Sequence, residues 1–172
     1  MDGGVIAYPT ESCYGLGCDP RRHASLRRLL RLKHRPRALG IIIIGADLEQ
    51  LHPYIDLSPS AIIDRMTATW PGPYTWLAPA RHGVSQWIRG DHSTVAVRIT
   101  AHPGASAVCR YARRAIVSTS ANRHNRLPAR SALGVRREFG DQLDYVLEGR
   151  LSGQENPTEI RDAITNQIIR PG

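Results

Sequence analysis

Four consecutive isoleucines, Ile41–Ile44, constrain the fold of this chain more than any other segment. β-branched residues favour extended strands, and a run without polar residues offers no face to water. We therefore expect a strand that is buried on both faces of its sheet. The run is far shorter than the roughly 20 apolar residues that cross a bilayer, and the sequence shows no signal peptide. We expect a cytoplasmic protein without a membrane partner.

Periodicity elsewhere in the chain indicates both helices and strands. Leucines at helical spacing in residues 23–33 predict an amphipathic helix. In residues 95–100 apolar and polar side chains alternate, which places Arg98 on the face opposite to Val97. Helices and strands interleave without strict alternation, so residues 1–172 predict a single α/β domain with a mixed parallel and antiparallel sheet. We expect further helices after Ser58-Pro59, at 103–112 and after Ser131, further strands at 5–8, 74–77, 116–118, 145–147 and 167–170, and loops at 10–17 and 119–122.

The basic residues of the chain are almost all arginine. Of 23 basic side chains Lys33 is the only lysine, and the net charge is +8. A positive balance of this size favours polyanionic partners such as nucleotides or RNA. A single retained ammonium indicates a role that a planar guanidinium does not fill. The three cysteines are too few and too irregularly spaced for a disulfide framework or a zinc site, so we expect free thiols and no metal site.

Three sequence features could bind an anion, although P-loop and nucleophile-elbow motifs are absent. Lys33 and Arg35 follow a predicted helix, residues 118–122 form a hydroxyl-rich bend after a strand, and Arg98 lies on a strand face. Each has an ordinary alternative, because basic residues often bind the last carbonyls of a helix and polar turns and strand arginines are common. Together they predict an anion site made of cations and hydroxyl donors, without a metal cage.

Six short blocks in a fixed order carry a family resemblance. They include Ala-Tyr-Pro-Thr-Glu at residues 7–11 and a Lys-x-Arg pair at 33–35, which is combined with a Ser-x-Asn loop at 120–122. Over nearly the whole chain the sequence resembles the YrdC-like, or TsaC, family of threonylcarbamoyl-AMP synthases. The resemblance implies a twisted mixed sheet of the YrdC/RibB-like type with flanking helices and a basic concave site. Relatives begin with a helix before the first strand, and this helix is expected to be missing here. The Lys-x-Arg pair lies in the block at residues 32–36 and the Ser-x-Asn loop in the block at 118–122. The remaining blocks are residues 14–20, 70–75 and 95–98, and the tail at 156–163 is similar to the short bacterial branch.

The resemblance also implies a reaction. L-threonine takes up CO2 or bicarbonate as a carbamate, which attacks the α-phosphate of ATP and releases pyrophosphate, with Mg²⁺ carried by the nucleotide. Partner proteins then transfer the threonylcarbamoyl group to tRNA. The implied catalytic residues are Lys33 and Arg35; the implied ATP-binding residues are Lys33, Arg35, Thr94, Ser120, Asn122 and Arg170; and the implied threonine-binding residues are Thr10, Arg98, Ser118 and Thr158.

The positive charge leaves a second interpretation open. The protein could be a non-enzymatic module that binds double-stranded RNA or tRNA, or a ribosome maturation factor. Arginine clusters such as Arg110, Arg113 and Arg114 motivate it, although such clusters are more often solvated surfaces. Only RNA binding without threonine-dependent ATP chemistry would favour this interpretation, because any basic surface binds structured RNA in a salt-dependent manner.

Overall fold

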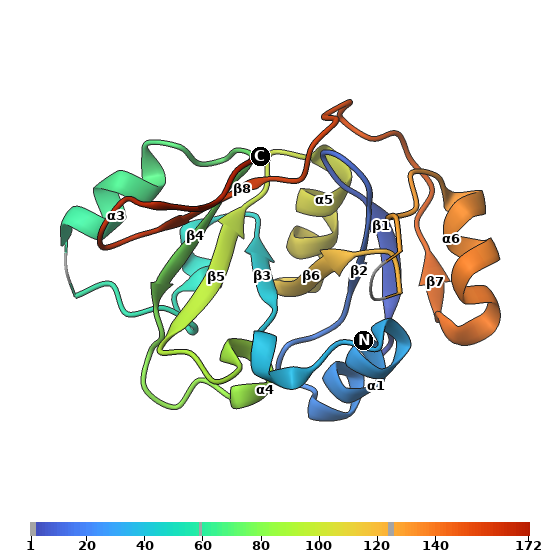
Figure 1. Ribbon diagram of the computed structural model, residues 1–172, viewed down its shortest axis with the longest axis horizontal. Coiled ribbons are helices and arrows are strands. Elements are labelled where there is room, and N and C mark those ends of the chain that lie inside the picture. The colour runs from blue at the N-terminus through green and yellow to red at the C-terminus, as the bar shows by residue number, and fades with distance from the viewer. Residues whose placement is uncertain (1–2, 59, 124–125) are drawn as a thin grey trace.

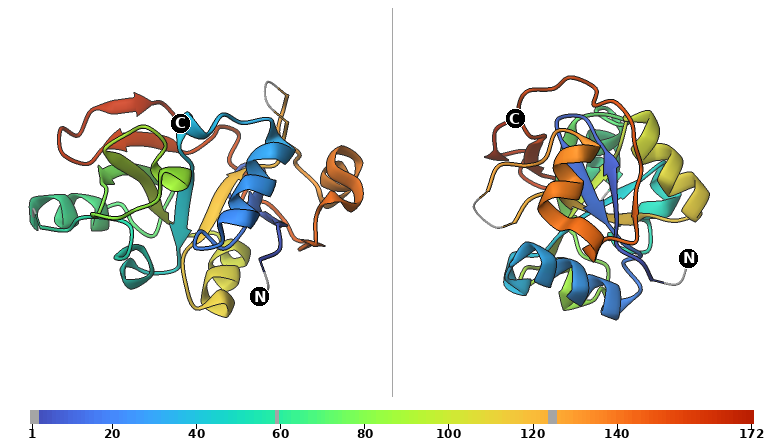
Figure 2. Two further views of the ribbon diagram at one scale, coloured as in Figure 1. Left: turned by 90° about the horizontal axis from the view of Figure 1, so that it is seen from below. Right: turned by 90° about the vertical axis from the view of Figure 1, so that its right-hand side faces the viewer.

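The computed structural model describes residues 3–58, 60–123 and 126–172 and has the α/β architecture that the sequence predicts. Nine strands form one mixed sheet in the order β7-β1-β2-β6-β3-β5-β4-β8-β9. Helix α3 lies at one end of the molecule and α6 at the other (Figures 1 and 2). The strands are β1 (Ile6–Pro9), β2 (Tyr14–Gly17), β3 (Ile42–Gly45), β4 (Tyr74–Pro79), β5 (Thr94–Ile99), β6 (Ile116–Ser120), β7 (Tyr145–Val146), β8 (Glu159–Asp162) and β9 (Ile168–Arg170).

Six α-helices and two 3-10 turns connect these strands within the described residues. Helices α1 and α5 have the bounds that the sequence predicts, and α6 begins after Ser131, whose Oγ accepts a hydrogen bond from the amide of Gly134. None of the helices in the described part of the chain is long and apolar enough to cross a membrane. The helices are α1 (His23–Lys33), α2 (Leu48–Leu51), α3 (Ser60–Thr67), α4 (Gln86–Arg89), α5 (Pro103–Ala112) and α6 (Ala132–Phe139), with 3-10 turns at Arg37–Leu39 and Gly140–Gln142.

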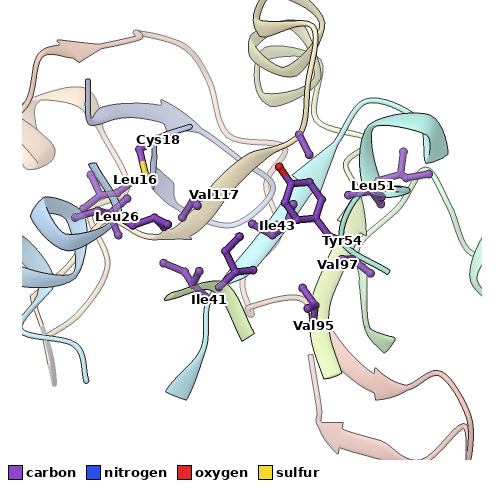
Figure 3. Packing of buried hydrophobic residues seen from close by; sticks show 14 of the residues in the cluster. Leu16, Cys18, Leu26, Ile41, Ile43, Leu51, Tyr54, Val95, Val97 and Val117 are labelled. Carbon is purple, nitrogen blue, oxygen red and sulfur yellow. The ribbon is translucent and has the colours of Figure 1, made fainter. Parts of the chain in front are cut away.

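Strand β3 is buried on both faces, as the isoleucine run predicts. It pairs in parallel with β5 and antiparallel with β6. Ile43 packs in the main hydrophobic core with Val97 and Val117, its partners in register (Figure 3). Ile44 points to the opposite face, into a second cluster that contains the buried residues of α5. The sheet therefore separates two hydrophobic layers. Arg98 is the register partner of Ile44, so Arg98 lies on the same face of the sheet as the second layer.

The segment between Tyr14 and Gly17 is strand β2, so the prediction of one continuous loop over residues 10–17 is wrong. β2 pairs antiparallel with β1 and with β6. A Cβ at Gly17 would lie 2.6 Å from the carbonyl oxygen of Val117 and 2.7 Å from the Tyr8 ring. Glycine is needed there because the backbone of β2 approaches its neighbours closely. In a sequence, glycines at this spacing usually indicate a loop, which is why the strand was not predicted.

Other boundaries differ from the sequence analysis by a few residues. β6 extends to Ser120, so the expected loop at 119–122 is shorter, and β8 was not predicted at all. β8 carries Glu159, Arg161 and Asp162 and lacks the apolar alternation that identifies strands in a sequence. The expected helix start at Ser58-Pro59 falls partly on Pro59, which lies outside the described residues; α3 is described from Ser60.

Candidate active site

A cavity of about 630 Å³ opens on the sheet face that carries Arg98. Its walls come from the strands β5 and β6, from the loop between β1 and β2, and from the segment that leads into β8. The register explains this convergence, because Ile42 pairs with Ser118 and Ile44 pairs with Arg98, which places both polar side chains on one face. The four residues implied for threonine binding all line this cavity: Thr10, Arg98, Ser118 and Thr158.

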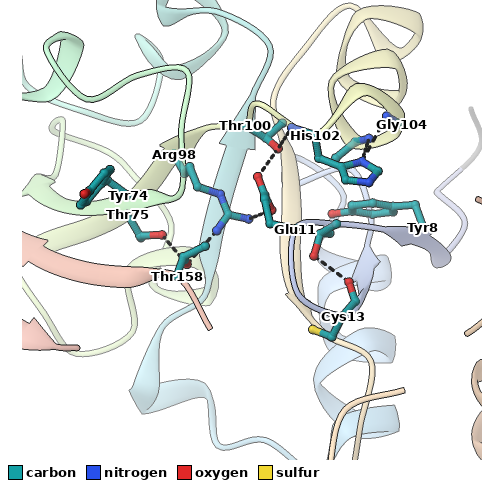
Figure 4. Close-up of polar contacts among 12 residues, drawn as sticks. Tyr8, Glu11, Cys13, Tyr74, Thr75, Arg98, Thr100, His102, Gly104 and Thr158 are labelled. Atoms are coloured by element: carbon teal, nitrogen blue, oxygen red, sulfur yellow. Dashed lines mark hydrogen bonds and ion pairs between the residues drawn. The ribbon is translucent and has the colours of Figure 1, made fainter. Parts of the chain in front are cut away.

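Arg98 is buried at 5% exposure and is held by hydroxyl and carboxylate groups (Figure 4). Its Nη1 donates to the Thr158 Oγ1 at 2.8 Å, and its Nη2 lies 3.4 Å from the Glu11 Oε2. The Glu11 Oε1 accepts a hydrogen bond from the Thr100 Oγ1 at 2.8 Å. Buried charges are costly unless they are paired, so Glu11 is the group that allows a guanidinium to lie this deep.

Glu11 is a site residue that the sequence reasoning missed. It appeared only as part of the block at residues 7–11, with no role. The available signal was an acidic residue placed directly after a strand in a strongly basic chain. No spacing rule, however, connects Glu11 with Arg98, which lies 87 positions later in the sequence.

Lys33, the first residue of the Lys-x-Arg pair, contacts the Ser-x-Asn loop, whereas Arg35 donates to the carbonyl of Gly40. The Lys33 Nζ donates to the carbonyl oxygens of Ser120 and Asn122 and to the Asn122 Oδ1, the last two at 2.8 and 3.1 Å. The Ser120 Oγ donates to the same Asn122 Oδ1 at 2.6 Å. An ammonium has three N–H groups, and all three point at this bend. Lys33 and Asn122 therefore lie behind the cavity wall, whereas Ser120 lines it.

Of the remaining residues implied for ATP binding, some line the cavity and one does not. Arg35 and Arg170 line the cavity, and the structure does not place Thr94 there. Thr94 lies on the same face of β5 as Arg98 but four residues away, roughly 13 Å along the strand. Alternation alone could not show that the cavity ends before Thr94, because its extent depends on loops from other parts of the chain.

Burial and neighbouring cations lower the pKa values of the basic side chains Lys33 and Arg35. Burial of Lys33 lowers the pKa of its ammonium to about 8, and the Arg35 guanidinium acts in the same direction. Burial likewise lowers the pKa of Arg35, with a further contribution from Arg170. The mutual effects of Lys33, Arg35 and Arg170 show that these cations lie near one another, and a cluster of cations favours a bound anion.

The single lysine permits a direct measurement of this shift. The ordinary pKa of a lysine is 10.5, so between about pH 8 and 10.5 the unfolded chain holds a proton that the folded chain has released. The contribution of Lys33 to the free energy of unfolding is therefore greatest above about pH 10.5 and falls as the pH is lowered to 8. We expect the Lys33 13Cε signal to titrate with a midpoint near 8 in NMR; a midpoint near 10.5 would contradict the burial argument.

Two further cavity residues carry reactive or charged groups. Cys13 is half-buried in the wall, and burial raises the pKa of its thiol. Arg130 also lines the cavity and is exposed to solvent. All three cysteines are free thiols, as expected. Within residues 3–58, 60–123 and 126–172, no three His, Cys, Asp or Glu side chains gather to hold a metal ion.

Comparison with known proteins shows the family to which the chain belongs. The Sua5/YciO/YrdC family model, described as telomere recombination, matches residues 1–172. The chain belongs to the Sua5/YciO/YrdC family. Its curated relatives include proteins named threonylcarbamoyl-AMP synthase from Nitrosococcus oceani and from Methylobacillus flagellatus. The first is 52% identical over 98% of this chain and 91% of its own length, and the second is 49% identical over 98% and 93%.

A solved structure of this family agrees with the fold described above. The crystal structure of P. abyssi Sua5 complexed with L-threonine superposes with a TM-score of 0.89 at 30% identity. The match covers 98% of this chain and 50% of the P. abyssi chain, so this protein spans about half the length of that relative. The expected YrdC-like mixed sheet with flanking helices is therefore confirmed.

Proposed function

We propose that this Sua5/YciO/YrdC protein is an L-threonylcarbamoyladenylate synthase. It combines L-threonine, CO2 or bicarbonate and ATP into threonylcarbamoyl-AMP and releases pyrophosphate, which makes it a nucleotidyltransferase. One observation carries the proposal: a single cavity is lined both by the buried Arg98 guanidinium, which donates to the Thr158 hydroxyl, and by Ser120, whose carbonyl accepts from the Lys33 ammonium. Curated relatives of nearly the same length bear this name, which supports the assignment.

The threonine subsite is assigned to the buried end of the cavity. Arg98 is the natural partner of the substrate carboxylate, because guanidinium and carboxylate form charge-assisted hydrogen bonds. Thr10, Ser118 and Thr158 offer hydroxyl groups around it. This arrangement holds a small polar amino acid, and the enclosed position of Arg98 excludes water from the carboxylate.

The nucleotide subsite is assigned to the bend and the arginines beside it. Ser120, Arg35 and Arg170 line the cavity and would contact phosphate oxygens, while Lys33 and Asn122 hold the bend in shape. The pocket offers cations rather than a carboxylate cage, so Mg²⁺ enters as part of the substrate MgATP.

The chemistry follows from placing these two subsites side by side. The neutral threonine amine bonds to the carbon of CO2 and releases one proton to solvent to form a carbamate, and a carbamate oxygen then attacks the α-phosphorus. The bond from that phosphorus to the bridging oxygen breaks, and pyrophosphate leaves with the electron pair. An in-line displacement of this kind is accelerated mainly by positioning and by positive charge around the phosphate oxygens, which the bend provides.

The test is pyrophosphate release with each substrate omitted in turn. We expect release only when ATP, threonine and bicarbonate are all present, and threonylcarbamoyl-AMP as the product by mass spectrometry. Release that does not depend on threonine contradicts the proposal. Tight tRNA binding without such release would favour the RNA-binding interpretation instead. Transfer to tRNA by partner proteins and a cytoplasmic location remain predictions.

A further inference from the structure

Arg130 lines the cavity but belongs to neither the threonine subsite nor the nucleotide subsite assigned so far. It lies between β6 and α6, directly before Ser131, the N-cap of α6. Its backbone position is well defined, because the adjacent Ala129 donates its amide to the carbonyl of Ala121 at 2.9 Å and accepts from the amide of Tyr14 at 2.8 Å. Ala121 is the middle residue of the Ser-x-Asn loop, so Arg130 emerges beside the phosphate bend.

The guanidinium of Arg130 is the least engaged of the four arginines in the cavity wall. Its only hydrogen bond in the described part of the chain is a 3.5 Å contact with the carbonyl of Glu155, and no carboxylate forms an ion pair with it there. By contrast, Arg35 donates twice to the carbonyl of Gly40, and Arg170 donates to that of Thr158 at 2.7 Å. Arg98 is held by Thr158 and Glu11.

The side-chain donors of Lys33 and Asn122 at the bend already have partners within the protein. The three N–H groups of Lys33 are directed at loop oxygens, and the Asn122 Nδ2 donates to the carbonyls of Arg123 and Arg126. These two side chains thus reach a phosphate only by giving up an existing partner. A cation with unused donors is needed for the outer phosphates, and Arg130 has them.

The in-line geometry of the reaction relates Arg130 to the β- and γ-phosphates of the nucleotide. The carbamate forms at the buried end of the cavity near Arg98, and in-line attack places the leaving group on the opposite side of the α-phosphorus. The pyrophosphate portion therefore faces the solvent-exposed rim, where Arg130 lies. Arg170 is the other exposed cavity arginine, and its hydrogen bond to the carbonyl of Thr158 holds its phosphate contact on the side of the nucleotide subsite nearest to threonine.

We propose that Arg130 binds the β- and γ-phosphates of ATP and stabilises the departing pyrophosphate. This inference rests on the proposed function and extends it by a residue outside the Lys-x-Arg and Ser-x-Asn pairs. Because the side chain is exposed, an Arg130→Ala variant is expected to keep the unfolding temperature of the wild-type protein.

The test compares ligands that differ in their phosphates. Binding of ATP, pyrophosphate and AMP is measured by calorimetry at one salt and Mg²⁺ concentration for the wild-type protein, R130A and R130K. We expect R130A to weaken ATP and pyrophosphate binding about 10-fold or more and to change AMP binding less than about 2-fold, with R130K between R130A and the wild type. The matched control is R137A, which removes the same charge from the exposed surface of α6.

Three results would overturn the assignment. The first is an equal loss of AMP binding in R130A, and the second is an equal loss of ATP binding in R137A, which would indicate a general effect of charge. The third is unchanged ATP binding in R130A. The readout requires no turnover. A wild-type protein that binds ATP but releases no pyrophosphate with threonine would therefore contradict the proposed function, while the role of Arg130 is still decided by the ATP and AMP affinities.

Discussion

Replacement of Lys33 by alanine is expected to lower the rate of threonine-dependent pyrophosphate release by about 100-fold or more. The ammonium connects three oxygens of the Ser120–Asn122 bend, and its removal leaves buried carbonyls without a donor and the bend without its shape. We expect Lys33→Arg to recover little activity, because a planar guanidinium cannot aim three donors at these three acceptors. The measurement is the initial rate at saturating ATP and threonine.

Two comparisons separate this effect from unfolding and from net charge. Lys33→Met preserves most of the buried side-chain volume without the charge, and its unfolding temperature shows whether the fold survives. Arg31→Ala removes an exposed charge from the same last turn of α1. If Lys33→Met folds and keeps near-normal activity, the ammonium is not required, and the assigned role of the bend is wrong.

Replacement of Arg98 is expected to act mainly on threonine. In Arg98→Ala the Glu11 carboxylate would remain buried without a cation, which typically costs about 3–5 kcal/mol of stability, so Arg98→Lys is the cleaner variant. A lysine keeps the charge but loses the fork that binds a carboxylate through two N–H groups. We expect the KM for threonine to rise about 10–100-fold, because each hydrogen bond to a charged group contributes about 1.5–3 kcal/mol.

The ATP dependence provides the control for this variant. The KM for ATP should change little in Arg98→Lys, since the Ser120 bend does not depend on Arg98 for any hydrogen bond among the described residues. An unchanged threonine KM, or a loss of equal size for ATP, would remove Arg98 from the threonine subsite.

Local sequence patterns predicted the parts of the site that depend on one element. The alternation in residues 95–100 placed Arg98 on the face opposite to Val97 and the main hydrophobic core, and the leucine spacing of residues 23–33 ended a helix at Lys33. Both follow from the geometry of a single strand or helix. The family resemblance then related Lys33 to the Ser-x-Asn loop, and the hydrogen bonds from Lys33 to Ser120 and Asn122 agree with that grouping.

Contacts between distant elements were not predictable in the same way. The sequence does not indicate that Glu11 lies beside Arg98, or that the donors of Lys33 are directed at the bend rather than at the cavity. Strand β2 was missed because the close approach of its backbone requires glycine, which in a sequence indicates a turn. In each case the deciding partner is supplied by tertiary structure.

The position of β8 and β9 has a consequence for biosynthesis. These two strands follow every other described strand in the sequence, yet Thr158 and Arg170 form one wall of the cavity beside β4 and β5. During translation the ribosome must therefore release residues 158–170 from its exit tunnel before both substrates can be held. A nascent chain arrested before that point would have most of its hydrophobic core but would lack Thr158 and Arg170, so the proposed activity arises only after residues 158–170 have been made.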